Sequence, residues 1–390
     1  MRIIAFTGFR LALVGCCLTA SLATGSDQAP SGSLAAFGPL LERAEAELSV
    51  PLATVMDKQL APPSGDRHDY FALSPYHWPN PDSSDGRPYV FRDGQVNPAA
   101  EGDGYDRMAY FRMGDAVTYL AVAFDVTKEA RYARRAAEWL RAWFVMPATR
   151  MNPNLRFAQC IPGDAEGLPI GLIRGMTIID VVRAERLLIG TAAWTHEDAD
   201  ALRGWAQDYL RWLREDSLGQ REARAQNNHG TWYDAQLASL ACYLGDVRLA
   251  RQVVATAATT RIAKQVQPTG RQPFELMRTK SWDYSVMNLE ALVTMADVGS
   301  AVNEDLWNFS TPDGRSIRRA LDFLLPFATG ADDWPSKQIK PFERGRLAPV
   351  LRRAAIAFPE GPYTVALDKV GPLDAATLLR CRLLEIPLSP

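Results

Sequence analysis

Helical periodicity runs through most of the chain after Gly104, and it restricts the folds that the chain can adopt. Apolar side chains recur at spacings of three and four residues from Tyr110 to Phe124 and again from Tyr132 to Phe144. Similar runs predict helices at residues 37–47, 167–189, 197–215, 231–244, 246–263, 283–299, 315–328 and 373–386. Because no segment shows sustained strand alternation, the sequence predicts an all-α fold. Successive antiparallel helices with short connections would form an (α/α) toroid or an incomplete barrel of helical hairpins, with a central groove.

The N-terminus has the pattern of an export signal. Arg2 and Arg10 precede an apolar run at residues 11–23, and small residues at the end of this run fit a cleavage site. We therefore predict that residues 1–23 are a signal peptide and that the protein is periplasmic or secreted. The sequence before Cys16 also resembles a bacterial lipoprotein box, and in that alternative Cys16 would be lipidated and would tether the protein to a membrane.

The rest of the chain is predicted to be one domain. Residues 24–35 are small and polar and are expected to be a flexible lead-in to a domain at residues 36–390. After the signal, no apolar run approaches the roughly 20 residues that a bilayer span requires, so no membrane span is expected. The net charge of -2 argues against a protein that binds nucleic acid through its whole surface.

The remaining cysteines give no sign of a disulfide framework or a zinc site. After the predicted cleavage these are Cys160, Cys242 and Cys381, an odd number without CxxC spacing. The sequence makes no prediction of the oligomeric state.

Residues 62–104 differ in character from the helical part. Prolines lie at positions 62, 63, 75, 79, 81, 88 and 98, and between them lie Tyr70, Phe71, Tyr76, Trp78, Tyr89 and Phe91. This density of proline excludes regular helix, and so many aromatic residues are unusual in a solvated linker. We predict a long ordered loop, which in most proteins is a functional one.

The stretch QNNHGTWYDAQ places Asn228 and His229 at the start of a helix. Thr231 and Asp234 give a start signal of the [ST]-x-x-[DE] type, and apolar residues at helical spacing follow. A helix N-terminus has unpaired N–H donors and a partial positive charge, so it attracts carboxylates. An amide and an imidazole there would both donate to one carboxylate. In the structural alternative, Asn228 only caps the helix and His229 is a satisfied structural histidine.

The stretch MRTKSWDYSVMNLEAL forms a second helix entrance. Arg278 precedes it, and Tyr284 lies in its first turn. In the structural alternative, Arg278 pairs with Glu275 on the surface and Tyr284 lies at the edge of the core.

Together these segments resemble the alginate lyase family of polysaccharide lyases. The similarity is carried, in order, by YFALSPYHWPNPDSSDGRPYVFRDGQVNP, MNPNLRFAQCIPG, NNHGTWYDAQ and RTKSWDYS. It implies an (α/α) toroid that cleaves an acidic polysaccharide by β-elimination, without a metal or cofactor. The family's Asn-His pair falls on Asn228 and His229, its arginine on Arg278 and its catalytic tyrosine on Tyr284. His77 departs from the family pattern, because many members have tryptophan there, and this puts the grip on substrate in doubt.

The chemistry explains why these groups are needed. β-Elimination removes the proton on C5 of a uronate and expels the oxygen on C4, and the charge that develops beside the carboxylate must be neutralised. Donors such as Asn228, His229 and Arg278 stabilise this charge more in the transition state than in the ground state. Because a tyrosine beside a cation loses its proton more easily, Tyr284 near Arg278 would be the base.

The face of the sugar determines how many groups are needed. In mannuronate and glucuronate, H5 and O4 lie on the same face, so Tyr284 would be both base and acid. In guluronate they lie on opposite faces, and His229 would be the second group. The catalytic residues do not distinguish mannuronate from glucuronate, which differ only at C2.

Further side chains are candidates for binding neighbouring sugars. These are Tyr76, Trp78, Tyr89, Arg92, Asn97, Asn154, Gln159, Asn227 and Trp232. In the alternative, half of the aromatic residues only pack the loop against the body.

Two other functional classes fit parts of the sequence. A glycoside hydrolase on a similar toroid needs two opposed carboxylates, for which Asp69, Asp93, Asp234 and Asp283 are available. A non-catalytic protein that captures polyuronates would keep the aromatic and basic groups but would tolerate the loss of the tyrosine hydroxyl.

Overall fold

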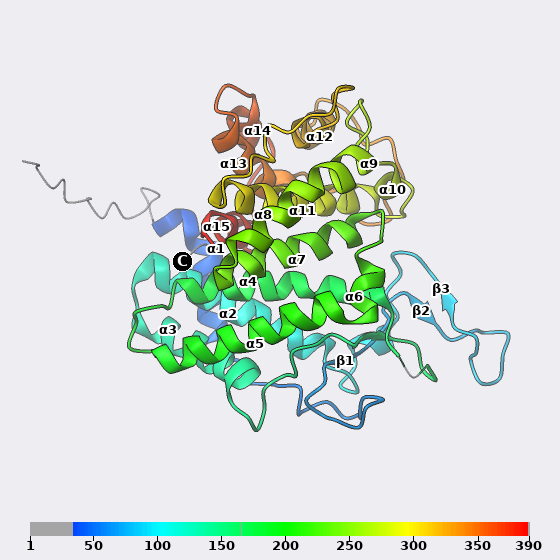
Figure 1. Ribbon diagram of the computed structural model, residues 1–390, viewed down its shortest axis with the longest axis vertical. Coiled ribbons are helices and arrows are strands. Elements are labelled where there is room, and N and C mark those ends of the chain that lie inside the picture. The colour runs from blue at the N-terminus through cyan, green and yellow to red at the C-terminus, as the bar shows by residue number, and fades with distance from the viewer. Residues whose placement is uncertain (1–33, 165, 389–390) are drawn as a thin grey trace, which may run out of the picture. The chain divides into compact units, whose positions relative to one another are not determined.

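Four helices with buried side chains around most of their circumference form an inner layer: α2 (Arg107–Thr127), α4 (Gly175–Arg186), α7 (Asn228–Leu244) and α11 (Ser281–Ala301). In the computed structural model, α4 packs on α2 and α7, and α7 also packs on α11 (Figure 1). A helix without a polar face is stable only when it is surrounded by other elements. These four helices are therefore the centre of the core.

Helices with one buried face cover the inner layer. In α3, for example, Tyr132, Ala136 and Leu140 are buried at helical spacing, and α3 packs on α2. The outer helices are α1 (Gly38–Glu47), α3 (Ala130–Leu140), α5 (His196–Glu215), α8 (Val247–Ala257), α12 (Ile317–Thr329), α13 (Ala348–Ala357) and α15 (Ala375–Glu385). The shorter helices are α6 (Ser217–Glu222), α9 (Ala263–Gln265), α10 (Pro273–Leu276) and α14 (Tyr363–Lys369). This two-layered arrangement confirms the predicted all-α (α/α) toroid.

The structure describes residues 34–164 and 166–388. The predicted signal peptide, Cys16 and nearly all of the lead-in lie outside the described residues. None of the described helices has both the length and the apolar character that a membrane crossing requires. The cysteines at positions 160, 242 and 381 are buried and unpaired.

Short turns of 3₁₀ or π-helix join or extend several of the helices. They are η1 (Leu34–Phe37), η2 (Pro98–Glu101), η3 (Arg141–Val145), η4 (Pro169–Arg174), η5 (Ala258–Ile262) and η6 (Arg344–Leu347). The helices α13 and α14 were not predicted; prolines lie at the start of α13 and just before α14, and both helices are short.

The proline-rich segment contains three of the four short strands: β1 (Phe71–Leu73), β2 (His77–Trp78) and β3 (Val90–Phe91). β1 pairs in parallel with β4 (Phe157–Cys160), and β2 pairs antiparallel with β3. Figure 1 shows the β2–β3 hairpin extending beyond the helices, on the side where α6 ends. The base of this hairpin is thus fixed to the helical body through β1.

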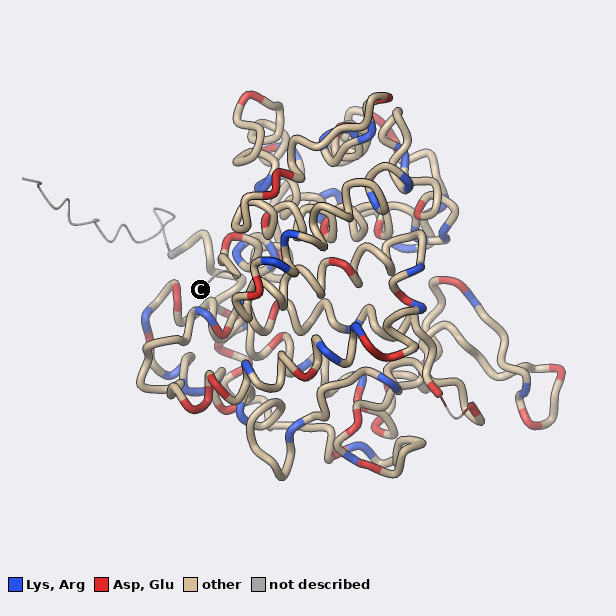
Figure 2. Tube along the Cα trace, viewed as in Figure 1, with Lys and Arg blue, Asp and Glu red and all other residues tan. Residues whose placement is uncertain are grey.

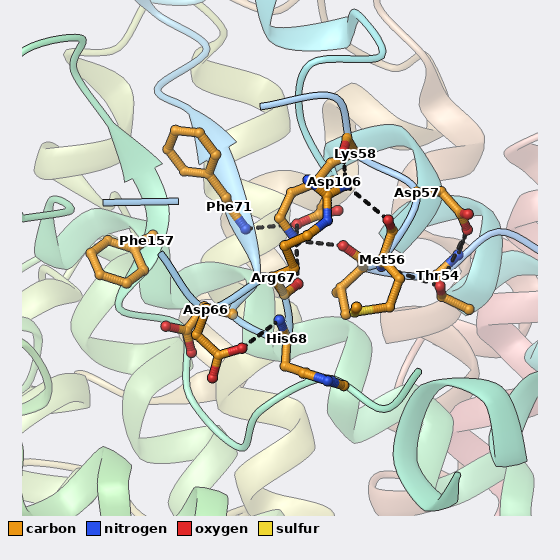
Figure 3. Close-up of polar contacts among 12 residues, drawn as sticks. Thr54, Met56, Asp57, Lys58, Asp66, Arg67, His68, Phe71, Asp106 and Phe157 are labelled. Atoms are coloured by element: carbon orange, nitrogen blue, oxygen red, sulfur yellow. Dashed lines mark hydrogen bonds and ion pairs between the residues drawn. The ribbon is translucent and has the colours of Figure 1, made fainter. Parts of the chain in front are cut away.

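A buried ion pair fixes the start of this loop. Lys58 Nζ lies 3.0 Å from Asp106 Oδ2, and both side chains have at most 1% exposure. The same Asp106 oxygen accepts the backbone N–H of Phe71 at 2.8 Å, as Figure 3 shows. Lys58 Nζ also donates to the carbonyls of Val55 and Arg67. One residue pair therefore joins the segment before β1, the strand β1 itself and the residue before α2.

Candidate active site

A cavity of about 720 Å³ lies where α7 and α11 begin. Its lining comes from the loop (Pro75, Tyr76, Phe91), from β4 and η4 (Gln159, Ile170, Ile173, Arg174), from the start of α7 (Ala225, Asn227, Asn228, His229), from the start of α11 (Arg278, Lys280, Asp283, Tyr284, Met287) and from the segment Lys340, Pro341, Glu343 and Arg346. Two helix N-termini at one cavity favour an anion there, because both present unpaired N–H donors. Figure 2 shows basic and acidic positions interspersed over the helices, so the positive character of the cavity is local.

Asn228 and His229 lie within the first turn of α7 rather than ahead of it. The N-cap is Asn227, whose Oδ1 accepts the backbone N–H of His229 at 3.2 Å. The predicted start signal was wrong, because Thr231 and Asp234 lie inside the helix. Asp234 instead pairs with Arg261 at 2.7 Å.

A buried carboxylate holds Asn228. Glu275 Oε1 accepts the backbone N–H of Asn228 at 2.6 Å, and Glu275 Oε2 accepts Asn228 Nδ2 at 2.7 Å. Burial raises the pKa of Glu275 above its ordinary value, although both of these hydrogen bonds act to lower it. The second Nδ2 hydrogen of Asn228 remains for a ligand, since an amide nitrogen has two.

His229 is oriented by a second buried carboxylate. Its Nδ1 lies 2.7 Å from Oε1 of Glu222, whose side chain is 2% exposed. Glu222 ends α6, so the imidazole is held between two helices. Because Nδ1 is used by Glu222, Nε2 is the ring nitrogen left for a ligand.

Arg278 is paired across the cavity edge with the loop. Its Nη2 lies 2.6 Å from Oδ1 of Asp93, and the same carboxylate accepts the backbone N–H of Thr279 at 2.9 Å. Burial opposes ionisation of Asp93, but the bonds from Arg278 and Thr279 prevail and lower the pKa of Asp93 to about 2. The surface pair with Glu275 that was considered as an alternative is not formed, since Glu275 is buried against Asn228.

Tyr284 lies in the first turn of α11, as predicted, with the guanidinium of Arg278 3.9 Å from its ring centroid. Its hydroxyl is 3.0 Å from the hydroxyl of Tyr76, which accepts a hydrogen bond from Lys280 Nζ at 2.9 Å. Burial and the adjacent Tyr76 raise the pKa of Tyr284, and this outweighs the effect of Arg278. Arg278 thus acts in the predicted direction, to lower the pKa of Tyr284, but it does not determine that pKa by itself.

The cavity brings together three of the candidate sugar-binding residues. Tyr76, Gln159 and Asn227 border it together with the four predicted catalytic residues. Gln159 Oε1 accepts a hydrogen bond from Ser74 at 2.9 Å, which fixes the amide at the cavity wall.

Trp232 does not border the cavity. It is 1% exposed in the inner layer, and its indole N–H donates to the carbonyl of Met287 at 3.1 Å. The predicted role in stacking on a sugar is therefore wrong, because α7 is buried around most of its circumference and leaves no face of this ring free.

The other candidates have structural partners outside the cavity lining. Asn97 is 5% exposed and caps η2, and Asn154 donates to Asp69 at 3.0 Å. The guanidinium of Arg92 lies 4.9 Å from the ring centroid of Trp78 on the hairpin, and Tyr89 is half-buried nearby in sequence. Of the described residues that line the cavity, none is Asn97, Asn154, Arg92, Trp78 or Tyr89.

Sequence reasoning missed five residues at or beside the site: Glu222, Glu275, Asp93 as the partner of Arg278, Lys280 and Phe91. Phe91 lines the cavity with 56% exposure and lies opposite His77 in the hairpin. Lys280 follows Arg278 within the quoted motif and Glu275 lies three residues before Arg278, just outside the motif, so proximity in sequence was an available signal. Glu222 lies seven residues before His229 and was available in the same way, whereas only the fold brings Asp93 to Arg278.

The carboxylates considered for a hydrolase have other partners. Asp69 accepts hydrogen bonds from Asn152 and Asn154, and Asp93 and Asp234 each pair with an arginine. Asp283 borders the cavity, and its Oδ1 lies 3.6 Å from Arg346. Within residues 34–164 and 166–388, no three His, Cys, Asp or Glu side chains are grouped so that they could hold a metal ion.

Comparisons with known proteins agree with this arrangement. A family model described as alginate lyase matches residues 54–334. An alginate lyase from Bacteroides ovatus is 33% identical, with a TM-score of 0.84 over 88% of this chain and 92% of that chain. Alginate lyase A1-III from Sphingomonas species A1 shares the fold at 15% identity, with a TM-score of 0.52 over 86% of this chain and 89% of that one. A variant of A1-III in complex with a tetrasaccharide aligns with a TM-score of 0.52 at 16% identity, over 83% of this chain and 86% of that one. A search of curated proteins gives no match.

Proposed function

The chain belongs to the alginate lyase family and is a polysaccharide lyase, and we propose that it cleaves polymannuronate, a form of alginate, by β-elimination at Tyr284. One observation carries the proposal: Asn228, His229, Arg278 and Tyr284 border the same cavity at two helix N-termini. Alginate is a polymer of uronates, so the substrate has a carboxylate on every sugar for such a cavity to bind. The tetrasaccharide bound by a relative of the same fold supports a groove that takes several sugars.

The substrate carboxylate is neutralised by three donors. Asn228 supplies the free Nδ2 hydrogen, His229 supplies Nε2, and Arg278 supplies the guanidinium N–H groups that Asp93 leaves free. As C5 loses its proton, the negative charge on the carboxylate increases, so each of these bonds strengthens in the transition state. A preorganised donor of this type is typically worth about 3 kcal/mol, or roughly a hundredfold in rate.

Tyr284 moves the proton. As the phenolate it accepts the proton from C5, and the electron pair of the C5–H bond forms the double bond between C4 and C5. The C4–O4 bond breaks as this double bond forms, and the leaving oxygen takes the proton from the Tyr284 hydroxyl. The new non-reducing end is an unsaturated uronate, and the phenolate is restored.

The choice of mannuronate follows from the face of the sugar. H5 and O4 lie on one face in mannuronate and glucuronate, and Tyr284 alone serves both steps. For guluronate, His229 would have to act as a base from the opposite face. That use would remove the Nε2–H group from the substrate carboxylate, because one ring nitrogen cannot both donate a hydrogen bond and accept a proton.

Ultraviolet absorbance of the unsaturated product tests the proposal. The purified protein is assayed separately on polymannuronate, polyguluronate and glucuronan, and polymannuronate should be cleaved fastest. Tyr284→Phe should abolish turnover while substrate binding largely survives. Release of saturated oligosaccharides would instead show that the protein is a hydrolase. Binding of the polymer without cleavage would show that it is a capture protein. Tyr284→Phe with near-normal turnover would remove this residue from the mechanism.

We further propose that the protein is exported, since residues 1–23 have the pattern of a signal peptide. The mass of the mature protein from periplasm or medium should correspond to cleavage near Ala23. A lipid-modified N-terminus at Cys16 would instead indicate a tethered enzyme.

A further inference from the structure

Lys280 is placed to act on Tyr284 through Tyr76. Its Nζ lies 2.9 Å from Tyr76 Oη, which in turn lies 3.0 Å from Tyr284 Oη. The same ammonium is 5.4 Å from the centroids of both phenol rings. A cation, a first phenol and a second phenol therefore form one hydrogen-bonded chain that ends at the cavity.

Two cations lie next to this pair of phenols, and they differ in their partners. Arg278 shares its charge with Asp93 at 2.6 Å. Among the described residues, no Asp or Glu forms an ion pair with Lys280. Because an ion-paired guanidinium has much of its field cancelled, Lys280, which donates to Tyr76 directly, is the stronger source of positive potential at the Tyr76 oxygen.

We propose that Lys280 is the positioning residue that keeps Tyr284 competent as a base, by donating to Tyr76 while Tyr76 donates to the Tyr284 phenolate. This inference rests on the proposed function, in which Tyr284 takes the C5 proton. It adds that the unit that accepts the proton is the Tyr76–Tyr284 pair with the Lys280 ammonium bound to Tyr76, and not Tyr284 alone beside an arginine.

The donors and acceptors balance along the chain. Lysine has only donors, and a tyrosine hydroxyl has one donor and two acceptor positions. Lys280 donates to Tyr76, and either hydroxyl of the Tyr76–Tyr284 bond can donate; in the proposed state Tyr76 donates, so the Tyr284 oxygen is left as an acceptor. When Tyr284 takes the C5 proton and passes it to O4, neither Tyr76 nor Lys280 loses a proton. The positive charge of Lys280 thus remains next to the pair through both steps.

The electrostatic effects favour loss of one proton from the pair and act first on Tyr76, so Tyr284 becomes the phenolate when its proton passes to Tyr76. Burial acts to raise the pKa of Tyr76, but the bonds from Lys280 and Tyr284 outweigh it and lower that pKa. Strongly coupled groups titrate as a unit, so the first proton leaves the pair more easily and the second is held more tightly. The raised pKa of Tyr284 is the second half of the same behaviour.

Other charged groups line the cavity around the two phenols. They are Arg174 on η4, His229 on α7, Asp283 on α11, and Lys340, Glu343 and Arg346 on the segment that covers the start of α11. None of these residues has a hydrogen bond to either phenol oxygen in the described structure, whereas Lys280 has one.

The pH profile of kcat/KM tests the inference. The base must be ionised, so turnover rises with pH through the first ionisation of the pair. Without the cation this ionisation needs a higher pH, and Lys280→Met should move the acidic limb up by about one to three pH units. Lys280→Arg keeps a cation at this position and should shift the acidic limb less. Lys369→Met, a matched change at an exposed position of α14, should leave the profile unchanged.

A second measurement does not need turnover. Absorbance titration of tyrosinate in the free enzyme should show one tyrosine with a low midpoint that rises in Lys280→Met and is lost in Tyr76→Phe. Circular dichroism confirms that each variant is folded. Turnover reduced by the same factor at every pH, or an unchanged tyrosinate midpoint, would overturn the role of Lys280. Failure of the unaltered enzyme to release unsaturated sugar would instead overturn the proposed function, and the titration would still test the phenol pair.

Discussion

Replacing Glu275 tests whether the amide of Asn228 must be held in place for catalysis. Glu275 is 1% exposed and accepts two bonds from Asn228, at 2.6 Å from the backbone nitrogen and 2.7 Å from Nδ2. Glu275→Ala removes both acceptors. The backbone N–H at the start of α7 then has no partner, and the side-chain amide can rotate away from the substrate carboxylate.

The size of the effect follows from these two bonds. A buried donor without a partner costs about 1–3 kcal/mol of folding stability. Misplacing a donor to the developing charge costs about 3 kcal/mol of transition-state stabilisation, which lowers kcat roughly a hundredfold. Glu275→Gln keeps one acceptor oxygen in the same place. We expect it to lower kcat by about tenfold, which is half of that energy.

The assay combines turnover with stability. The initial rate of unsaturated product gives kcat and KM, and urea unfolding followed by circular dichroism gives the free energy of unfolding. Glu360→Ala is the control, because the Glu360 side chain is 64% exposed and makes only a weak pair with Arg318 at 3.4 Å. If folded Glu275→Ala turned over substrate at the rate of the unaltered enzyme, the amide of Asn228 would not depend on this carboxylate.

Two further predictions concern the charges that hold the loop. Asp93→Asn should lower kcat/KM by about ten- to a hundredfold, because it removes a charge-assisted bond that orients Arg278. The pKa of Asp93 falls from 3.8 to about 2 on folding, so its contribution to stability is present above about pH 4 and is lost as the pH falls towards 2. Urea unfolding of the unaltered protein and of Asp93→Asn at several pH values should show that the difference in their free energies of unfolding decreases between about pH 4 and pH 2. A difference that stays constant over this range would contradict the prediction. Asp106→Ala should lower the free energy of unfolding by about 3–5 kcal/mol, since it leaves Lys58 buried without its carboxylate. Lys58→Met combined with Asp106→Leu should recover most of that loss in the same assay, and no recovery would mean that the aspartate acts mainly through the N–H group of β1.

The sequence predicted the helices that have a clear apolar stripe, and it predicted the entrances to α7 and α11. Their positions follow from local periodicity, which needs no knowledge of the rest of the chain. The cap at Asn227 was missed because two start signals overlap within five residues, and only the backbone geometry distinguishes them. Trp232 was misassigned because a motif beside a site says nothing about which way each side chain of a buried helix points.

The electrostatics of the site required the three-dimensional structure. Arg278 and Asp93 are separated by 185 positions, and nothing local in the sequence indicates that they pair. Among the described residues, this pairing leaves Lys280 beside the phenols without an ion-pair partner, which is why we propose that it acts on Tyr284 through Tyr76. Spacing within a motif predicts which residues gather, but their charge states depend on partners from elsewhere in the chain.

The bond between the hydroxyls of Tyr76 and Tyr284 joins positions 208 residues apart. Closing so long a segment of chain costs conformational entropy, which is recovered only after the helices between the two positions have packed. Helices such as α3 and α5 depend on local contacts and can form before that point. The circular dichroism signal of the helices and the recovery of turnover therefore report different stages of refolding. Turnover should recover last.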